Sequence, residues 1–146
     1  MKKTVFAIWG HEKQGKSDTI KRIAQEITAT YPTAITSPVT INYSADIQVF
    51  ITIGKITIGI ESQGDPNSRL FTSLELFSSS NCDIVVCSTR TSGETVDAVG
   101  AMYSSHGYDI VWITNHRSIN KNQTSLNEIS AKHIFGLIRQ VMAGTL

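Results

Sequence analysis

The stretch that decides the fold is residues 4–17, Thr-Val-Phe-Ala-Ile-Trp-Gly-His-Glu-Lys-Gln-Gly-Lys-Ser. Its first six residues form a short apolar run, which is typical of a buried strand. Beyond it, apolar residues recur at positions 20, 23, 24 and 27, the spacing of one face of a helix. The sequence therefore predicts a strand over 4–9, a tight loop, and a helix over about 16–29.

The loop between that strand and helix has the pattern G-x-x-x-x-G-K-S, from Gly10 to Ser17. Gly10 and Gly15 permit backbone angles that a Cβ would forbid, so the loop can curl around an anion. Its amide groups and the positive end of the helix dipole then favour negative charge. Lys16 adds an ammonium group and Ser17 a hydroxyl, so the pattern predicts a phosphate-binding turn.

Residues 4–29 resemble the strand, loop and helix that open the P-loop NTPases, and the chain order resembles their kinase–GTPase branch. The resemblance implies a nucleoside triphosphate, ATP or GTP, bound together with Mg²⁺. Lys16 would reach the β- and γ-phosphates, and the Ser17 hydroxyl would ligate the metal. The residues expected around the nucleotide in this segment are Gly10, His11, Glu12, Lys13, Gln14, Gly15, Lys16, Ser17 and Asp18.

Strand and helix patterns alternate along the rest of the chain. Residues 47–53 and 56–60 read as an antiparallel hairpin around a Gly-Lys turn. Residues 83–88 and 109–114 read as further strands, each followed by a helical pattern. We expect an α/β, three-layer, P-loop NTPase-like fold over a single domain, residues 1–146. Its sheet would have five strands, mostly parallel, with helices on both faces.

An acidic turn follows the second hairpin strand, from Glu61 to Asp65. Ras-like GTPases carry D-x-x-G at this place, and Glu61-Ser-Gln-Gly64 is similar, with Glu for Asp. The resemblance implies that Glu61 holds Mg²⁺ directly or through water, that Gln63 orients a water, and that the Gly64 amide meets the γ-phosphate. Asp65 is a competing metal ligand, or only a helix cap before Pro66.

Two other segments offer side chains to the site. Arg90 follows the strand over 83–88, where its guanidinium reaches a phosphate or else lies on the surface. The catalytic candidates are therefore Lys16, Glu61, Gln63 and Arg90. The interval 30–45 is a plain connection or carries a further Mg²⁺ ligand among Thr33, Thr36 and Thr40.

Asn115 follows the last strand, where Ras-like GTPases place N-K-x-D to read guanine. Asn115 matches the first position and would contact the nucleotide, but the Lys and Asp are missing. The pattern therefore favours ATP over GTP.

Composition limits the class of protein. The net charge is +1, so nothing indicates a nucleic-acid partner, and no apolar stretch has the length of a membrane span. Cys82 and Cys87 lie in or beside an apolar run and read as buried, reduced thiols, which predicts a cytoplasmic protein. Besides the nucleotide, a protein partner or a second copy of the chain is expected.

Three functions fit these patterns. The first is a Mg²⁺-dependent NTP hydrolase that acts as a switch. The second is a kinase for a small molecule or nucleotide, although no arginine-rich lid is evident. The third is a nucleotide-binding module without catalytic activity.

Overall fold

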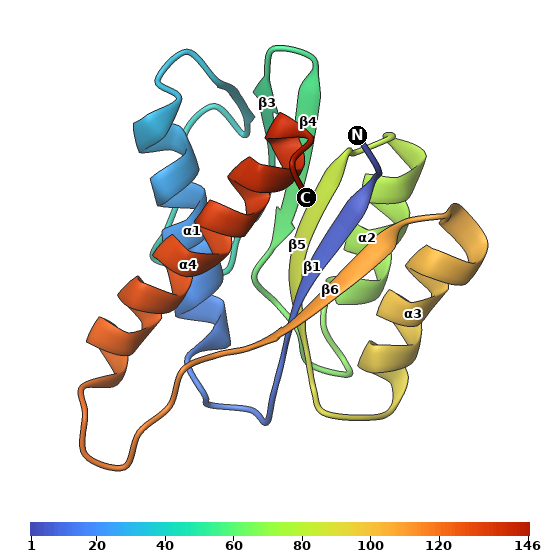
Figure 1. The fold of residues 1–146 in the computed structure, drawn as a ribbon. Coiled ribbons are helices and arrows are strands. Elements are labelled where there is room, and N and C mark those ends of the chain that lie inside the picture. Colours follow the sequence, from blue (N-terminus) through green and yellow to red (C-terminus); the bar gives the residue numbers. More distant parts are fainter.

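A computed structural model describes all 146 residues of the chain (Figure 1). Ten elements follow one another along the sequence. They are β1 (Thr4–Trp9), α1 (Lys16–Thr30), β2 (Ile35–Ser37), β3 (Gln48–Ile53), β4 (Ile56–Glu61), α2 (Leu70–Ser79), β5 (Ile84–Thr89), α3 (Glu94–His106), β6 (Asp109–Thr114) and α4 (Gln123–Ala143).

The sheet has six strands in the order β2-β3-β4-β5-β1-β6. Strands β4, β5, β1 and β6 are parallel, and the β3–β4 hairpin is antiparallel, as the sequence predicted. The expected count of five strands is wrong, because β2 pairs antiparallel with β3, placing Ile35 opposite Thr52 and Ser37 opposite Phe50. A strand of three residues is too short to show a two-residue period, so only its pairing with β3 reveals it.

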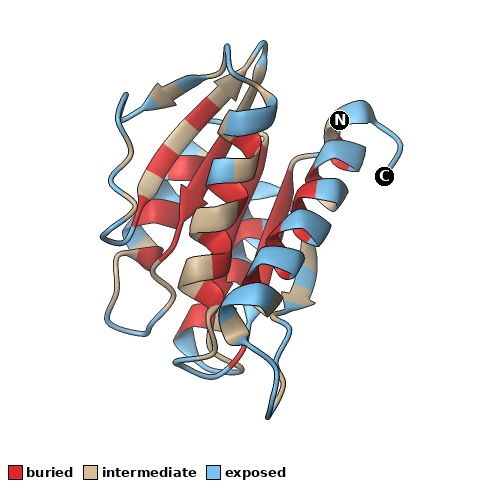
Figure 2. Cartoon of the chain, turned by 90° about the vertical axis from the view of Figure 1, so that its left-hand side faces the viewer, coloured by how far each residue is buried: buried red, intermediate tan, exposed pale blue.

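Two pairs of helices cover the two faces of the sheet (Figure 1). Apolar residues of α1 and α4 pack with Phe6 and Ile8 on one face, while those of α2 and α3 pack with Val5 and Ala7 on the other. Figure 2 shows the buried residues concentrated in the sheet and on the inner sides of the helices. The three-layer arrangement with helices on both faces is therefore confirmed.

The start of α2 differs from the expectation for Asp65. The helix begins at Leu70, and residues 65–68 instead form a turn in which the Ser68 N–H donates to the Asp65 carbonyl at 3.1 Å. Asp65 is therefore not a helix cap, and its carboxylate is available for other contacts.

The parallel strands bring distant loops to one edge of the sheet. The segments after β1, β4 and β5 all leave at the lower edge in Figure 1. In open α/β sheets, ligands bind beyond the carboxyl ends of the strands, so this edge is where a site is expected. None of the helices combines the length and apolar character that crossing a bilayer requires.

Candidate functional site

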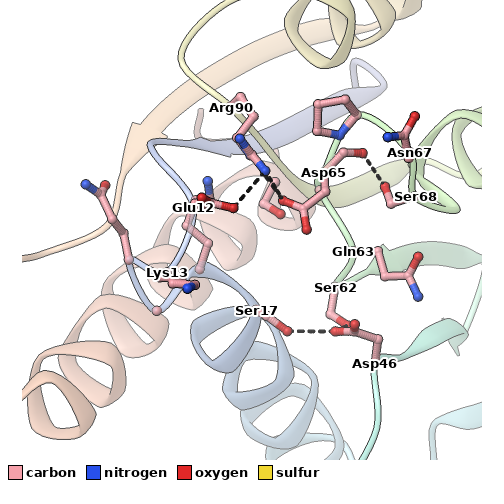
Figure 3. Close-up of a pocket in the computed structure, with 16 residues that line it drawn as sticks. Glu12, Lys13, Ser17, Asp46, Ser62, Gln63, Asp65, Asn67, Ser68 and Arg90 are labelled. Carbon is pink, nitrogen blue, oxygen red and sulfur yellow. Dashed lines mark hydrogen bonds and ion pairs between the residues drawn. The ribbon is translucent and has the colours of Figure 1, made fainter.

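A cleft of about 680 Å³ opens at this edge, between the loop after β1 and the turn after β4 (Figure 3). It is lined by residues 12–17, residues 62–68, Asp46, Ser88 and Arg90. Apart from Pro66, every lining residue is polar, charged or glycine. Such a lining suits a highly charged, hydrated group rather than a flat apolar ring.

In the loop over 10–17, the conformational freedom expected of glycine is used at Gly15 but not at Gly10, which does not have a positive φ. Gly15 has a φ of +80° and stands immediately before α1. A Cβ at Gly15 would lie 2.6 Å from the Oδ1 atom of Asn127, so both its angle and its surroundings require glycine. The cleft is lined by Glu12, Lys13, Gln14, Gly15, Lys16 and Ser17, whereas Gly10, the exposed His11 and Asp18 lie outside the lining.

Lys16 is buried at the base of the cleft, with 8% of its surface exposed. Its ammonium donates to the carbonyls of Gly10, His11 (3.0 Å) and Thr89 (2.8 Å), which uses all three of its hydrogens. Burial lowers the pKa of Lys16 to about 8, and the neighbouring Arg90 adds to that effect. The hydrogen bonds of this positive charge thus go only to neutral carbonyls, while the carboxylates of Asp65 and Glu12 act on it from a longer distance and raise its pKa.

Ser17 lies beside a carboxylate that the sequence did not indicate. Its hydroxyl donates to Asp46 Oδ1 at 2.8 Å, and the Ser62 hydroxyl donates to the same oxygen at 2.7 Å (Figure 3). Burial alone would raise the pKa of Asp46, but these two hydrogen bonds, with nearby Lys21 and Arg69, lower it below its ordinary value. The ionised carboxylate and the hydroxyls form a set of hard oxygen donors of the kind that Mg²⁺ prefers.

Asp46 was missed because it ends a long irregular connection and belongs to no motif. The alternatives offered by the sequence in that connection, Thr33, Thr36 and Thr40, are absent from the cleft lining. The only available signal was a carboxylate directly before an apolar strand, and that pattern is common. Side chains alone do not complete a metal site here, since no three His, Cys, Asp or Glu residues are grouped to hold an ion.

Glu61 does not line the cleft. It is fully buried, and its carboxylate accepts hydrogen bonds from Arg69 at 2.6 and 2.9 Å, from the Ser73 hydroxyl, and from the Gln63 N–H at 3.0 Å. Each oxygen is therefore already engaged by two donors. The arrangement makes Glu61 the acceptor that fixes the start of α2 to the end of β4, rather than a metal ligand facing the cleft.

Gln63 and Gly64 do line the cleft, but both also hold the turn in place. The Gln63 Oε1 atom accepts from the Arg69 N–H at 2.8 Å, ahead of α2. A Cβ on Gly64 would lie 2.6 Å from the Ser88 carbonyl oxygen, so glycine lets this turn pack against the end of β5. The backbone of the turn is thereby fixed beside the cleft.

Arg90 bridges the two sides of the cleft. Its guanidinium pairs with Asp65 at 3.0 Å and with Glu12 at 3.2 Å, linking the turn after β4 to the loop after β1 (Figure 3). The two carboxylates are about two-thirds exposed, so these pairs are weak and easily exchanged. Asp65 thus meets Arg90 in this structure, while the Ser17 hydroxyl meets Asp46.

Asn115 and Asp18 hold the loop from behind rather than facing the cleft. The Asn115 amide donates to the Gln14 carbonyl at 2.9 Å and to Asn127 Oδ1 at 2.8 Å, and its Oδ1 accepts from Thr19 at 2.7 Å. Asp18 accepts from Asn127 at 2.9 Å. These contacts join the loop over 10–17, the end of β6 and α4, so Asn115 supports the loop conformation.

No family model, curated protein or solved structure matches this chain. Any functional assignment therefore depends on the geometry and chemistry of the cleft.

Proposed function

We propose that this chain is a P-loop protein that binds a nucleoside triphosphate with Mg²⁺ in the cleft and hydrolyses it as a switch. The observation that carries the proposal is the buried Lys16 ammonium at the start of α1, inside a polar cleft beyond the carboxyl ends of β1, β4 and β5. A cation whose hydrogen bonds all go to neutral carbonyls favours a ligand with several negative charges.

Lys16 would bind the β- and γ-phosphates by exchanging its carbonyl acceptors for phosphate oxygens. The exchange replaces neutral acceptors with negatively charged ones, so each hydrogen bond of the ammonium gains the Coulomb attraction of an ion pair. Arg90 would be released from Glu12 and Asp65 in the same way and would stabilise charge that develops on the transferred phosphate. Gln63 would orient the attacking water.

Ser17 and Asp46 are the residues that would hold Mg²⁺, together with phosphate oxygens and water. Both supply hard oxygen donors, and they are already within hydrogen-bond distance of each other. The chemistry that the metal supplies is neutralisation of phosphate charge. Glu61 has no part in this proposal because its oxygens are fully engaged elsewhere.

The base favoured by this proposal is adenine. Asn115, the one residue that matches the guanine-reading pattern, has both side-chain groups engaged by the loop and its neighbours. A cytoplasmic location is part of the proposal and is supported by Cys82 and Cys87, which are buried free thiols.

The test is phosphate release from Mg²⁺–ATP by the purified protein. We expect turnover that falls by roughly a hundredfold or more in Lys16→Ala, because removing one preorganised donor of this kind costs about that much. Lys55→Ala, which removes an exposed lysine of the β3–β4 turn outside the cleft lining, serves as the matched control and should retain activity. Equal activity of the Lys16→Ala variant and the wild type would contradict the proposal.

A second candidate is a nucleotide-binding module without turnover. Two observations favour this candidate: the Glu61 carboxylate is paired with Arg69, and the Gln63 side-chain oxygen accepts from the Arg69 N–H. Few groups are then left to activate a water. Tight Mg²⁺–ATP binding without phosphate release would favour this candidate, whereas phosphate transfer to an added nucleoside or nucleotide would favour a kinase.

A further inference from the structure

Strand β6 is an unpaired edge of the sheet. It pairs with β1 on one side and with no strand on the other (Figure 1). The Asp109 N–H donates to the Lys3 carbonyl at 2.8 Å, so residues 109, 111 and 113 direct their main-chain groups toward β1. Ile110, Trp112 and Thr114 therefore direct theirs outward, away from the sheet.

Large aromatic side chains lie next to this open edge. Trp112 is 41% exposed and Trp9 is 37% exposed, on the same face of the sheet. Together with Thr91 and Val96 they line a hollow of about 240 Å³. An open edge strand with exposed apolar side chains is a template for pairing with another strand, and proteins usually protect such edges.

We propose that β6 pairs with β6 of a second copy of this chain, forming a symmetric dimer with one continuous sheet. A twofold axis normal to the sheet leaves corresponding faces of the two copies on the same side of the joined sheet. Because side chains alternate between the faces along a strand, two residues opposite each other must both have even numbers or both have odd numbers. Pairing Trp112 with Trp112 of the second copy satisfies this rule. It also places Ile110 opposite Thr114, so that all three outward-facing residues exchange main-chain hydrogen bonds.

The charges along the edge agree with this register. Asp109 begins the strand, and beyond its last residue, Thr114, the chain continues into His116 and Arg117. In an antiparallel pair, Asp109 of each copy therefore comes beside the basic end of the other, and no like charges face one another. The Ile110 N–H donates to the Asp109 carboxylate at 2.9 Å and in the dimer would donate instead to the Thr114 carbonyl of the second copy.

The register also sets side-chain contacts that a chance association would not reproduce. The two Trp112 rings would lie opposite each other on the face that carries Trp9, and Val111 would lie opposite Ile113 on the other face. Cross-strand pairs of aromatic and β-branched residues are among those that stabilise antiparallel sheets.

The first test is the mass of the full chain in solution, measured by light scattering over a range of micromolar concentrations. We expect a species of twice the 16.0 kDa chain mass, and a shift to one chain mass in Trp112→Lys. Tyr103→Lys, at an exposed aromatic residue of α3, is the matched control and should leave the dimer intact. A wild-type monomer throughout, or a dimer that persists in Trp112→Lys, would overturn the proposal.

The second test reports the register and does not depend on the lysine variant folding. Residues opposite each other in a hydrogen-bonded antiparallel pair have Cα atoms about 5.5 Å apart, within the range of a disulfide. Trp112→Cys should therefore form a cross-linked dimer under oxidation, while Tyr103→Cys should not. Both natural thiols are buried, and burial raises the pKa of each to about 12, so they do not compete. Equal cross-linking of the two variants would overturn the register.

Discussion

The loop over 10–17 and the acidic turn over 61–65 face each other across one cleft, yet they relate to the sequence in different ways. In the loop, local residues determine the arrangement: glycine at position 15 allows the turn, and Lys16 and Ser17 follow it onto the first turn of α1. In the acidic turn, the residue that matched the motif, Glu61, is buried beneath the surface. The carboxylate that meets Ser17 is Asp46, which is 29 residues away in the sequence.

The difference follows from what determines each feature. A backbone turn depends on φ and ψ, which glycine controls locally. The partner of a carboxylate depends on which cations and donors the fold brings near it. Arg69 and Ser73 reach Glu61 only because α2 packs against β4, and that packing is not visible in the motif.

The largest expected effect is on the stability of the fold, and it distinguishes the structural role of Glu61 from the role of Asp46. Glu61→Gln should lower the free energy of unfolding by about 2–3 kcal/mol, because it leaves Arg69 without its charged partner. The loss is smaller than for a fully buried pair, since Arg69 is 35% exposed and can turn toward water. Urea denaturation measures it, with the exposed Glu75→Gln on α2 as the matched control. A change no larger than that of the control would contradict the structural role of Glu61.

The next effect concerns Mg²⁺. Asp46→Asn should lower the affinity for Mg²⁺ in the nucleotide complex by about tenfold, which is typical when a metal site loses a supporting carboxylate. Nucleotide binding should then depend less on Mg²⁺. Titration calorimetry at several Mg²⁺ concentrations measures it, with the exposed Asp97→Asn as control. If Glu61→Gln rather than Asp46→Asn altered the Mg²⁺ dependence, the assignment of the two carboxylates would be reversed.

A substitution at Asn115 tests whether this residue contacts the nucleotide base or only supports the loop over 10–17. Asn115→Ala should weaken ATP and GTP binding by a similar factor, roughly fivefold, because each lost hydrogen bond is worth about 1 kcal/mol and the loop relaxes for both ligands. Competition binding with both nucleotides measures the ratio. A loss confined to one nucleotide would show that Asn115 contacts the base.

The smallest effect is a dependence on pH. The pKa of Lys16 is about 8 in the free protein, and a bound polyphosphate would raise it, so binding takes up protons above pH 8. The affinity for the nucleoside triphosphate should therefore be highest below pH 8 and should decline as the pH rises above 8. Lys16→Arg, whose guanidinium stays charged, should lack this decline. The same decline in both variants would assign the titration to another group.

Much of the fold could be predicted because periodicity and glycine placement act locally. The strand over 4–9, the helix from Lys16 and the hairpin around Gly54 all follow from such patterns. The strand β2 could not be predicted, since its three residues are ordered by pairing with β3. Within the site, the loop residues 12–17 were identified, whereas Asp46 and the burial of Glu61 depend on tertiary packing.

The most direct measurement is a crystal structure with a non-hydrolysable ATP analogue and Mg²⁺. We predict that the Lys16 ammonium leaves the carbonyls of Gly10, His11 and Thr89 and contacts the β- and γ-phosphates, with the metal beside Ser17 and Asp46. A structure in which Lys16 keeps its carbonyl partners while the triphosphate binds elsewhere, or does not bind, would contradict the account.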